Sequence, residues 1–322
     1  MRAITYSRFG APEEVLRCEE RPQPTPGDDE LLIAVRAAAV NPLDWHFVRG
    51  TPYLARMAFG LRQPRNPWLG VDAAGVVEAV GRNVTAFQPG DEVFGNCRGA
   101  FAEYALSKES AVVGKPASVA FEQAAAAPVA GYTALQALRH RGSIQPGQRV
   151  LVNGAAGGVG TFAVQIAKSF GAEVTGVCST RNVDLVRSLG ADRVVDYSAE
   201  DFTRDAARYD LILDCIGNHS LADCRRVLQP SGRYVQVGGQ GSAWLGPFPR
   251  AIAILLLSPF VKQPLALMLA KGTRDDLIAL RDLMAAGTVK PVIDRRYALR
   301  EVPAAVAYVE AGHARGKVIV TP

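Results

Sequence analysis

The stretch that decides the fold reads R-V-L-V-N-G-A-A-G-G-V-G and runs from Arg149 to Gly160. Residues 150–152 form a short apolar run typical of a buried β-strand, and an Asn-Gly pair ends it. A helical pattern follows over residues 158–170. A strand, a glycine-rich turn and a helix in this order form the context of a dinucleotide-binding fingerprint, although a tight turn in an ordinary βαβ unit has the same pattern.

Physical chemistry explains why such a turn would bind a phosphate. Glycine lets the backbone approach a pyrophosphate closely and lets the helix pack against the strand. The N-terminus of the helix adds free N–H groups and the positive end of the helix dipole. We therefore expect a dinucleotide to lie against Ala156, Gly157, Gly158 and Val159.

The 322 residues divide into two patterns, and this length favours two domains. Residues 1 to about 120 contain short strands separated by Gly and Pro, which is typical of a small barrel or folded sheet. A helical stretch, 122–138, follows, with Pro128 as a break. Five strands then alternate with helices expected at 158–170, 182–189, 198–206 and 220–228. The alternation predicts a doubly wound parallel sheet and the α/β class.

The last part of the chain is expected to be helical to about residue 287. A strand over 289–293, a helix over 303–311 and a strand over 317–320 follow. The most apolar run, 251–257, is far shorter than the ~20 residues of a membrane span. We expect it to be a buried helix or a subunit interface. The final strand suggests that the chain returns to complete the first domain.

Composition limits the classes of function. Hydrophobic residues make up 48% and charged residues 21%, as in a globular enzyme. The net charge of +5 is scattered, so we expect no nucleic-acid partner. Five dispersed cysteines indicate reduced intracellular thiols, and the first residues do not resemble a signal peptide. We expect a cytoplasmic protein that acts on a small molecule and does not bind a membrane.

Six motifs span nearly the whole chain: A-A-A-V-N-P-L-D-W at 37–45, G-V-D-A-A-G-V-V at 70–77, P-G-D-E-V-F-G at 89–95, G-Y-T-A at 131–134, G-A-A-G-G-V-G at 154–160 and G-H-A-R-G-K-V at 312–318. In this order they resemble the medium-chain dehydrogenase/reductase superfamily, and most of all its zinc-free quinone oxidoreductase branch. The resemblance implies a GroES-like β domain of residues 1–124, completed by 271–322, and a Rossmann domain of residues 125–270, with the active site in the cleft between them. It also implies a homodimer, which we expect to use 251–257 and 265–269.

The resemblance allows a test for zinc. Zinc-dependent members carry a Cys after the first long strand and a G-H-E segment later. This chain has Asn41-Pro42-Leu43-Asp44 and Gly70-Val71-Asp72 at those places, and its four histidines do not have ligand spacing. We therefore expect no metal. Without zinc, alcohol oxidation lacks its Lewis acid, so reduction of an activated substrate is favoured.

The cofactor is expected to be NADP. NAD-binding proteins carry an acidic residue about 20 residues past the glycines. Here Ser179, Thr180 and Arg181 stand near that place, and they could bind a 2′-phosphate. Helix capping by the two hydroxyls and a solvated Arg181 remain open alternatives. Tyr197 matches a position that contacts the same phosphate in the family, although an exposed strand-end aromatic would look the same.

The resemblance also implies the active-site residues. Asn41 and Asp44 are the catalytic candidates on the nicotinamide and substrate side, and Thr133 lies near the nicotinamide. A turn residue before proline and a helix-capping carboxylate are the alternatives for Asn41 and Asp44. The remaining cofactor-binding candidates are Cys215, Gly217, Val237, Gly238, Gly239, Arg315 and Lys317. For the last two, a role as charged surface residues remains open.

The expected function is zinc-independent reduction of a quinone or an α,β-unsaturated carbonyl by NADPH. Two alternatives remain open at this point. One is a zinc-free enoyl-thioester reductase. The other is a catalytically silent NADPH-binding regulatory protein.

Overall fold

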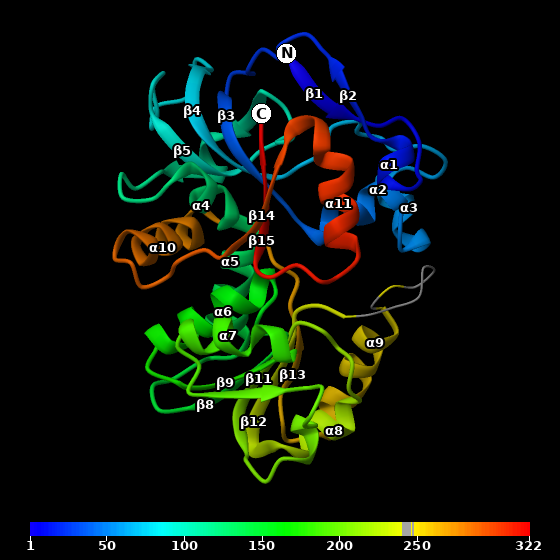
Figure 1. Cartoon of the computed structure of the whole chain (residues 1–322), viewed down its shortest axis with the longest axis vertical. Coiled ribbons are helices and arrows are strands. Elements are labelled where there is room, and N and C mark those ends of the chain that lie inside the picture. The colour runs from blue at the N-terminus through cyan, green and yellow to red at the C-terminus, as the bar shows by residue number, and fades with distance from the viewer. Residues whose placement is uncertain (240–245, 247) are drawn as a thin grey trace. The chain divides into compact units, whose positions relative to one another are not determined.

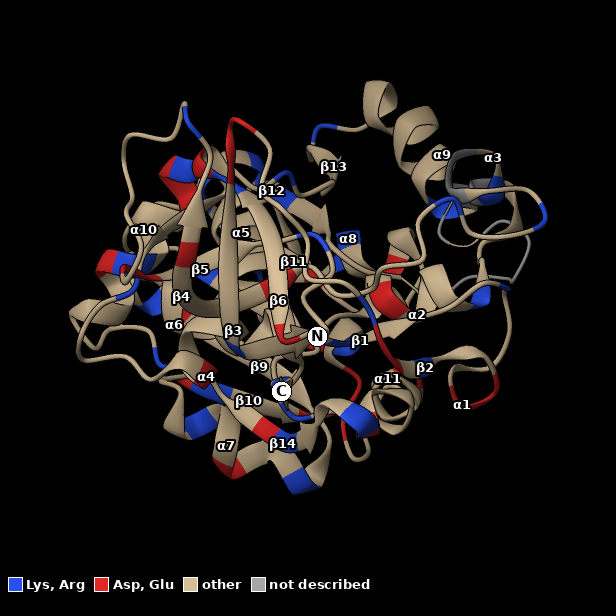
Figure 2. Ribbon diagram, turned by 90° about the horizontal axis from the view of Figure 1, so that it is seen from above, with Lys and Arg blue, Asp and Glu red and all other residues tan. Residues whose placement is uncertain are grey.

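The computed structural model describes residues 1–239, 246 and 248–322, and it divides the chain into two compact units (Figure 1). Unit 1 consists of Met1–Tyr132 and Gly272–Pro322, and unit 2 consists of Thr133–Lys271. Both ends of the chain therefore build unit 1, whereas unit 2 is one continuous stretch. Lys and Arg are interspersed with Asp and Glu along the elements of both units (Figure 2).

Unit 2 contains a parallel sheet in the order β10-β9-β8-β11-β12-β13. Its strands are β8 (Arg149–Asn153), β9 (Glu173–Cys178), β10 (Arg193–Asp196), β11 (Tyr209–Asp214), β12 (Leu228–Gln236) and β13 (Leu265–Leu267). Numbered within the sheet, this is the order 3-2-1-4-5-6 of a doubly wound dinucleotide-binding fold. The strand order reverses between β8 and β11, so the ends of these two strands mark the place where such folds bind ligands.

The helices of unit 2 lie between these strands: α6 (Gly158–Ser169), α7 (Val183–Ser188), α8 (Leu221–Arg226) and α9 (Phe248–Leu257). The central residues of β8 and β11 are apolar and buried, as in a parallel sheet that is covered on both faces. Leu151, Val177 and Ile212, from three neighbouring strands, are at most 1% exposed. The predicted α/β class and doubly wound sheet are confirmed.

Unit 1 contains a sheet in the order β14-β15-β3-β4-β5-β7, with β6 paired to β3, and a separate pair β1-β2. The strands are β1 (Arg2–Thr5), β2 (Arg17–Glu20), β3 (Glu30–Val40), β4 (Asp72–Val80), β5 (Glu92–Asn96), β6 (Tyr104–Lys108), β7 (Val112–Gly114), β14 (Ile293–Ala298) and β15 (Lys317–Thr321). The C-terminal strand β15 pairs with β3, so the end of the chain joins the sheet of unit 1.

Short helices accompany the sheet of unit 1: α1 (Pro12–Val15), α2 (Pro42–Arg49), α3 (Arg56–Phe59), α4 (Phe121–Ala126), α10 (Arg274–Ala285) and α11 (Val302–Glu310). The expected break at Pro128 is confirmed, because α4 ends at Ala126 and α5 (Pro128–Gln136) begins at the proline. No helix in the described part of the chain is long and apolar enough to cross a membrane.

The predicted helix over residues 198–206 is wrong. Only a 3-10 turn, Phe202–Arg204, forms there. Three backbone amides that a helix would need donate instead to aspartate side chains. Asp196 accepts from the Ser198 amide, Asp201 from the Thr203 amide and Asp205 from the Ala207 amide. Such local bonds compete with helix formation.

Two predictions for the C-terminal part are also wrong. The segment to residue 287 is not helical throughout, because Leu265–Leu267 forms β13 and covers the backbone edge of β12. The strand expected at 289–293 lies later, at Ile293–Ala298. Pro291 has no N–H for a ladder, whereas the charged Arg295 and Arg296 are tolerated because β14 is an edge strand.

The apolar run 251–257 forms most of α9, but it is not buried within the chain. Ile254 is 2% exposed, whereas Ile252, Leu255 and Leu256 are 54%, 72% and 66% exposed. The helix therefore packs one face on the sheet and leaves an apolar face open. Burial as a core helix is wrong, and the subunit interface stays a prediction.

Candidate functional site

The turn after β8 contains glycines with different physical roles. Gly154 has φ +85°, which disfavours other residues. A Cβ on Gly160 would lie 2.1 Å from the Gly154 carbonyl oxygen, so α6 can pack against the turn after β8 only with glycine there. Gly157 differs, because it caps α6 with φ −82° and a Cβ on it would meet only the Gly154 oxygen, at 3.4 Å. The fold requires Gly154 and Gly160, whereas Gly157 leaves open space at the helix N-terminus.

The three other residues expected at the pyrophosphate lie on the same turn. Ala156 is 6% exposed, and Gly158 and Val159 begin α6 half-buried. The free N–H groups of the first helical turn therefore come from this segment. A phosphate group fits such a helix start.

The residues expected at the 2′-phosphate meet at the ends of β9 and β10. Asp196 pairs with Cys178 in the sheet register, and the Tyr197 amide donates to the Cys178 carbonyl at 3.0 Å. Ser179 follows directly and its Oγ accepts from the Asn182 side chain at 3.1 Å, so it does not cap a backbone amide. Tyr197 is 60% exposed.

Thr180 and Arg181 lie in the 3-10 turn that follows Ser179. The Thr180 hydroxyl bonds to the Asp196 carboxylate and, as the main cause, holds the pKa of that carboxyl below its usual range. Arg181 is exposed. The structure thus brings Ser179, Thr180, Arg181 and Tyr197 to one place, with the Asp196 carboxylate next to Thr180.

The loops after β11 and β12 touch each other through glycines. A Cβ on Gly238 would lie 2.4 Å from the Cys215 carbonyl oxygen, and one on Gly217, at φ +72°, would lie 3.0 Å from Gly239 Cα. The Val237 amide donates to the Asp214 carbonyl at 2.8 Å. Burial raises the pKa of the Cys215 thiol, which therefore stays neutral. All five cofactor candidates on these loops gather at the carboxyl ends of the strands.

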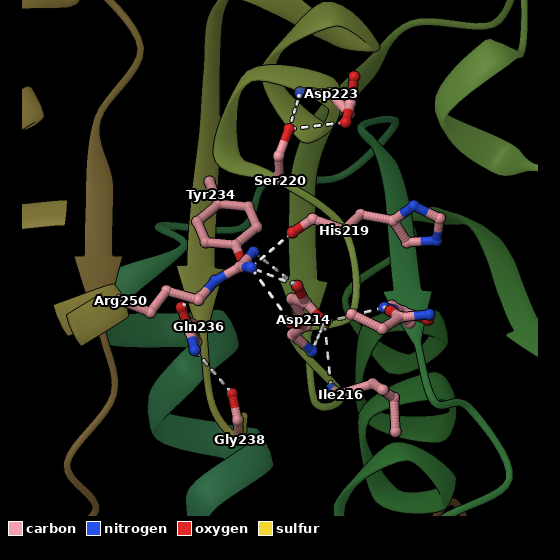
Figure 3. Close-up of polar contacts among 12 residues, drawn as sticks. Asp214, Ile216, His219, Ser220, Asp223, Tyr234, Gln236, Gly238 and Arg250 are labelled. Carbon is pink, nitrogen blue, oxygen red and sulfur yellow. Dashed lines mark hydrogen bonds and ion pairs between the residues drawn. The ribbon is translucent and has the colours of Figure 1, made fainter. Parts of the chain in front are cut away.

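Asp214, the last residue of β11, organises the first of these loops, and sequence reasoning missed it (Figure 3). It is fully buried. Its Oδ1 accepts from Asn153 Nδ2 at 2.9 Å and from the Ile216 and Gly217 amides at 3.1 and 2.8 Å. Its Oδ2 accepts from the Tyr234 hydroxyl at 2.7 Å. An acidic residue that ends an otherwise apolar strand was the available signal.

Unit 1 holds a second polar cluster, formed by Asn41, Asp44, Asp72 and Lys317. All four side chains are at most 3% exposed. Three neighbouring strands bring them together, because β15 and β4 flank β3 on its two sides. Asn41 Nδ2 donates to Asp72 Oδ2 at 2.9 Å, and Lys317 Nζ donates to Asn41 Oδ1 at 2.5 Å. Asn41 therefore links a carboxylate to an ammonium group.

Asp44 lies in the first turn of α2, where its Oδ2 accepts from the Asn41 backbone amide at 2.8 Å. The alternative role of Asp44, a carboxylate that caps the helix start, therefore holds for its Oδ2 atom. Its other oxygen, Oδ1, is buried and has no hydrogen-bond partner among the described residues. Asp44 is consequently both a structural carboxylate and a candidate for proton chemistry.

Burial changes the protonation of the two carboxyl groups. It raises the pKa of Asp44 to about 7, against the opposing effect of the Asn41 amide. It raises the pKa of Asp72 to about 6, against the opposing effect of Lys317. Asp72 also accepts from Asn96 Nδ2 at 2.9 Å and lies 3.8 Å from Lys317 Nζ. We place the proton on Asp44, because the Lys317 ammonium group and more hydrogen-bond donors stabilise the ionised form of Asp72.

The remaining predicted site residues lie as follows. Lys317 is in the buried cluster, so its alternative as a surface residue is wrong. Arg315 is exposed, and its amide donates to Asp294 Oδ2 at 2.9 Å. Thr133 lies on α5 and is 7% exposed. In the part of the chain that the structure describes, no three His, Cys, Asp or Glu side chains are grouped to hold a metal ion.

Two protein families match different parts of the chain. Residues 27–117 match the alcohol dehydrogenase GroES-like domain, and residues 189–320 match a family described as zinc-binding dehydrogenase. The first match lies within unit 1, and the predicted GroES-like β domain is confirmed.

Full-length relatives point the same way. The chain is 33% identical to the chloroplastic quinone oxidoreductase QR1 of Triphysaria versicolor, over 100% of this chain and 98% of the relative. The quinone oxidoreductase of Coxiella burnetii has a similar structure, with a TM-score of 0.88, 29% identity, and coverage of 100% of this chain and 99% of the other. The Escherichia coli quinone oxidoreductase solved with NADPH has a TM-score of 0.85 and 25% identity, with 100% of both chains covered.

Proposed function

Because the chain belongs to the medium-chain dehydrogenase/reductase superfamily and to its quinone oxidoreductase-like branch, we propose that it is an NADPH-dependent reductase of quinones or α,β-unsaturated carbonyls. Membership of this family makes the chain an oxidoreductase with a nicotinamide cofactor. The observation that carries the finer proposal is the arrangement of unit 2. Gly157 caps α6 after β8 and leaves room beside the helix start, and hydroxyl and guanidinium groups lie at the end of the neighbouring strand β9.

In the proposed binding mode, each phosphate group of NADPH lies at its own strand end in unit 2. Gly157 and the start of α6 would hold the pyrophosphate, and Ser179, Arg181 and Tyr197 would hold the 2′-phosphate. A 2′-phosphate gains from charge-assisted bonds to a guanidinium group. No acidic residue occupies positions 178–181, where the ribose ligand of an NAD-binding protein is expected. When bound, the reduced nicotinamide supplies a hydride.

We propose that the reaction does not use zinc. The support comes from the cluster in unit 1 at the places where zinc-dependent members carry their ligands. Asn41 is bonded to both Asp72 and Lys317, and the Lys317 ammonium group lies 2.5 Å from Asn41 Oδ1. A buried cation disfavours a second cation beside it. Elemental analysis should find no stoichiometric zinc and chelators should leave activity intact; one tightly bound zinc per chain would contradict this.

Without a Lewis acid, the substrate must already be electron-poor. A quinone or an enone meets this condition, since it accepts a hydride with only hydrogen-bond and proton assistance. Asp44 is the proposed source of that proton. A carboxyl group with a pKa of about 7 is partly protonated at neutral pH, which suits a general acid. The Asp72–Lys317 pair keeps the proton on Asp44.

Asn41 has two competing roles in this proposal. In one role, its side-chain amide would donate to the oxygen of the reduced acceptor. In the structure the same Nδ2 donates to Asp72 at 2.9 Å and, more weakly, to the Ala39 carbonyl at 3.4 Å. A role in positioning Asp72 and Lys317 therefore competes with direct stabilisation of the substrate.

We further propose a homodimer. Leu255 and Leu256 on α9 are 72% and 66% exposed, and Phe260 and Leu269 nearby in the chain are 86% and 78% exposed. Large apolar side chains exposed to this degree along one short segment of the chain favour a protein–protein interface. A second copy of the chain would cover it.

A substrate panel tests the proposed function. NADPH oxidation is followed with 1,4-benzoquinone, an enal, a crotonyl-type thioester and a simple ketone. We expect turnover with the quinone or the enal, and little with the ketone. The thioester as the best substrate would instead identify an enoyl-thioester reductase. Tight NADPH binding without any turnover would identify a regulatory protein, and a preference for the ketone would refute the reductase assignment.

A further inference from the structure

Arg250, on the first half of α9, uses its whole guanidinium group for contacts with the sheet of unit 2 (Figure 3). Nε donates to Gln236 Oε1 at 2.7 Å. Nη1 donates to the Gly217 carbonyl at 3.1 Å and to the His219 carbonyl. Nη2 donates to the Tyr234 hydroxyl at 2.6 Å and approaches Asp214 Oδ2 at 3.4 Å. Five N–H groups in a rigid plane meet five acceptors.

Two of these acceptors belong to the loop that follows β11, and the other three are side chains of β11 and β12 themselves; a second loop follows β12. Gly217 and His219 lie on the first loop, and Arg250 binds their carbonyl groups directly. Gln236 is the last residue of β12, and its Nε2 donates to the Gly238 carbonyl at 3.0 Å on the second loop. One guanidinium group therefore holds both loops, the first directly and the second through Gln236.

The first loop and residues 237–239, the described start of the second loop, have little freedom to move separately. A Cβ on Gly238 would lie 2.4 Å from the Cys215 carbonyl oxygen and one on Gly217 would lie 3.0 Å from Gly239 Cα, so the backbones of the two loops are closely packed. Asp214 fastens the first loop from the other side, through the Ile216 and Gly217 amides. Loss of Arg250 would leave the fully buried Asp214 carboxylate without its cation, and a buried charge that loses its partner is costly. The loops would then rearrange together.

The order of the strands indicates which part of the cofactor these loops would meet. In the sheet, β9, β8, β11 and β12 are consecutive neighbours. If the 2′-phosphate lies at the end of β9 and the pyrophosphate at the end of β8, the nicotinamide end continues toward β11 and β12. A dinucleotide laid across the carboxyl ends of the strands in this way is the general arrangement for such sheets.

We infer that Arg250 is a positioning residue for the nicotinamide half of the cofactor: it touches no substrate, but it holds the two loops that would contact the nicotinamide ribose. The inference rests on the proposed function, because it requires a nicotinamide nucleotide in unit 2. A purely structural role for Arg250 would affect every ligand of unit 2 equally. A positioning role affects the nicotinamide half and spares the adenosine half.

The experiment compares two ligands in three variants of the full chain. NADPH reports on the whole site, and adenosine 2′,5′-bisphosphate reports on the adenosine half alone. Arg250→Met removes the guanidinium group, and Arg250→Lys keeps the charge but not the five donors. Arg225→Met is the matched control, because Arg225 is a half-buried arginine on α8 whose Nε donates to the Gln263 side chain at 2.8 Å and not to either loop. Affinities come from fluorescence or calorimetric titration, and kcat and KM come from NADPH oxidation with 1,4-benzoquinone.

For Arg250→Met we expect at least a fivefold rise in the Kd of NADPH and at least a tenfold fall in kcat, with the bisphosphate Kd within twofold of wild type. The Kd of NADPH and the kcat of Arg250→Lys should lie between those of wild type and Arg250→Met. Both values should be those of wild type in Arg225→Met. Equal weakening of both ligands, or no change in NADPH binding and kcat, would overturn the inference. If Arg250→Met does not fold, Arg250→Lys decides by the same comparison. A wild-type protein that binds neither ligand would refute the proposed function itself.

Discussion

Two glycines of one turn should respond in opposite ways to the same substitution. Gly160→Ala places a Cβ 2.1 Å from the Gly154 carbonyl oxygen and 2.8 Å from Ala155 Cα. These are backbone atoms of the turn after β8, so α6 must move away from that turn. Gly157→Ala adds a Cβ that meets only the Gly154 oxygen, at 3.4 Å, and its φ of −82° is accessible to alanine.

The magnitudes follow from these contacts. Overpacking costs about 1–3 kcal/mol, and a clash between backbone atoms belongs at the upper end. Alanine regains about 1 kcal/mol of helix propensity at Gly160, which leaves a net loss of about 2 kcal/mol. Such a loss lowers the melting temperature by roughly 4–8 °C for a unit of this size. At Gly157 the folded state can accommodate a Cβ. The free energy of unfolding should therefore stay constant or rise by about 0.4–1 kcal/mol, because alanine lowers the conformational entropy of the unfolded chain.

For Gly157→Ala we expect a loss of NADPH affinity, although the stability of the protein is kept. Its Cβ would occupy the space that a pyrophosphate needs, so we expect the Kd of NADPH to rise by at least about tenfold, or about 1.4 kcal/mol. Thermal unfolding measures the stability of both variants, and fluorescence titration measures NADPH binding. A Gly157→Ala protein that binds NADPH as wild type does would refute the placement of the pyrophosphate. An equally stable Gly160→Ala protein would refute the role assigned to that glycine.

Three further predictions concern the cofactor, the acid and the assembly. Arg181→Ala should weaken NADPH binding by about 1.5–3 kcal/mol and leave NADH nearly unchanged in titrations, and an equal loss for both would contradict the 2′-phosphate site. Because burial raises the Asp44 pKa from 3.8 to about 7, its contribution to stability is complete below about pH 4 and is lost as pH rises to about 7; Asp44→Asn should therefore gain stability relative to wild type between about pH 4 and 7, and should also remove a fall in kcat above about pH 7. Identical pH profiles for Asp44→Asn and wild type would exclude Asp44 as the acid. Light scattering should show a dimer for wild type and a monomer for Leu255→Glu, and a monomeric wild-type protein at micromolar concentration would contradict the proposed interface.

The sequence was most informative where local patterns and tertiary packing agree. The strands of unit 2 are short apolar runs between turns, and their alternation with helices predicts the sheet. Residues 198–206 were mispredicted because three aspartate side chains bond to nearby amides, and such bonds leave no periodic signal. The strand β13 was missed because three apolar residues suit a helix as well as a strand, and only pairing with β12 decides between them.

The candidate site shows the same limit. The turn at 154–160 is contiguous, and its glycines identify it directly. The buried cluster of unit 1 joins Asn41 to Lys317, which are 276 positions apart, so no local pattern indicates the contact. Arg250 likewise binds residues of two other strands and loops, and its signal in the sequence is only one basic residue at the start of an apolar helix.

Transfer of deuterium from the cofactor tests the central claim most directly. The protein is mixed with NADPH that carries two deuterium atoms at C4 of the nicotinamide, and with an α,β-unsaturated ketone, in the presence of a chelator. The account predicts that the saturated product gains one deuterium at the β carbon, as measured by mass spectrometry, and that the amount formed equals the NADPH oxidised. A product without deuterium, or NADPH that stays reduced with the ketone and with 1,4-benzoquinone alike, would contradict it.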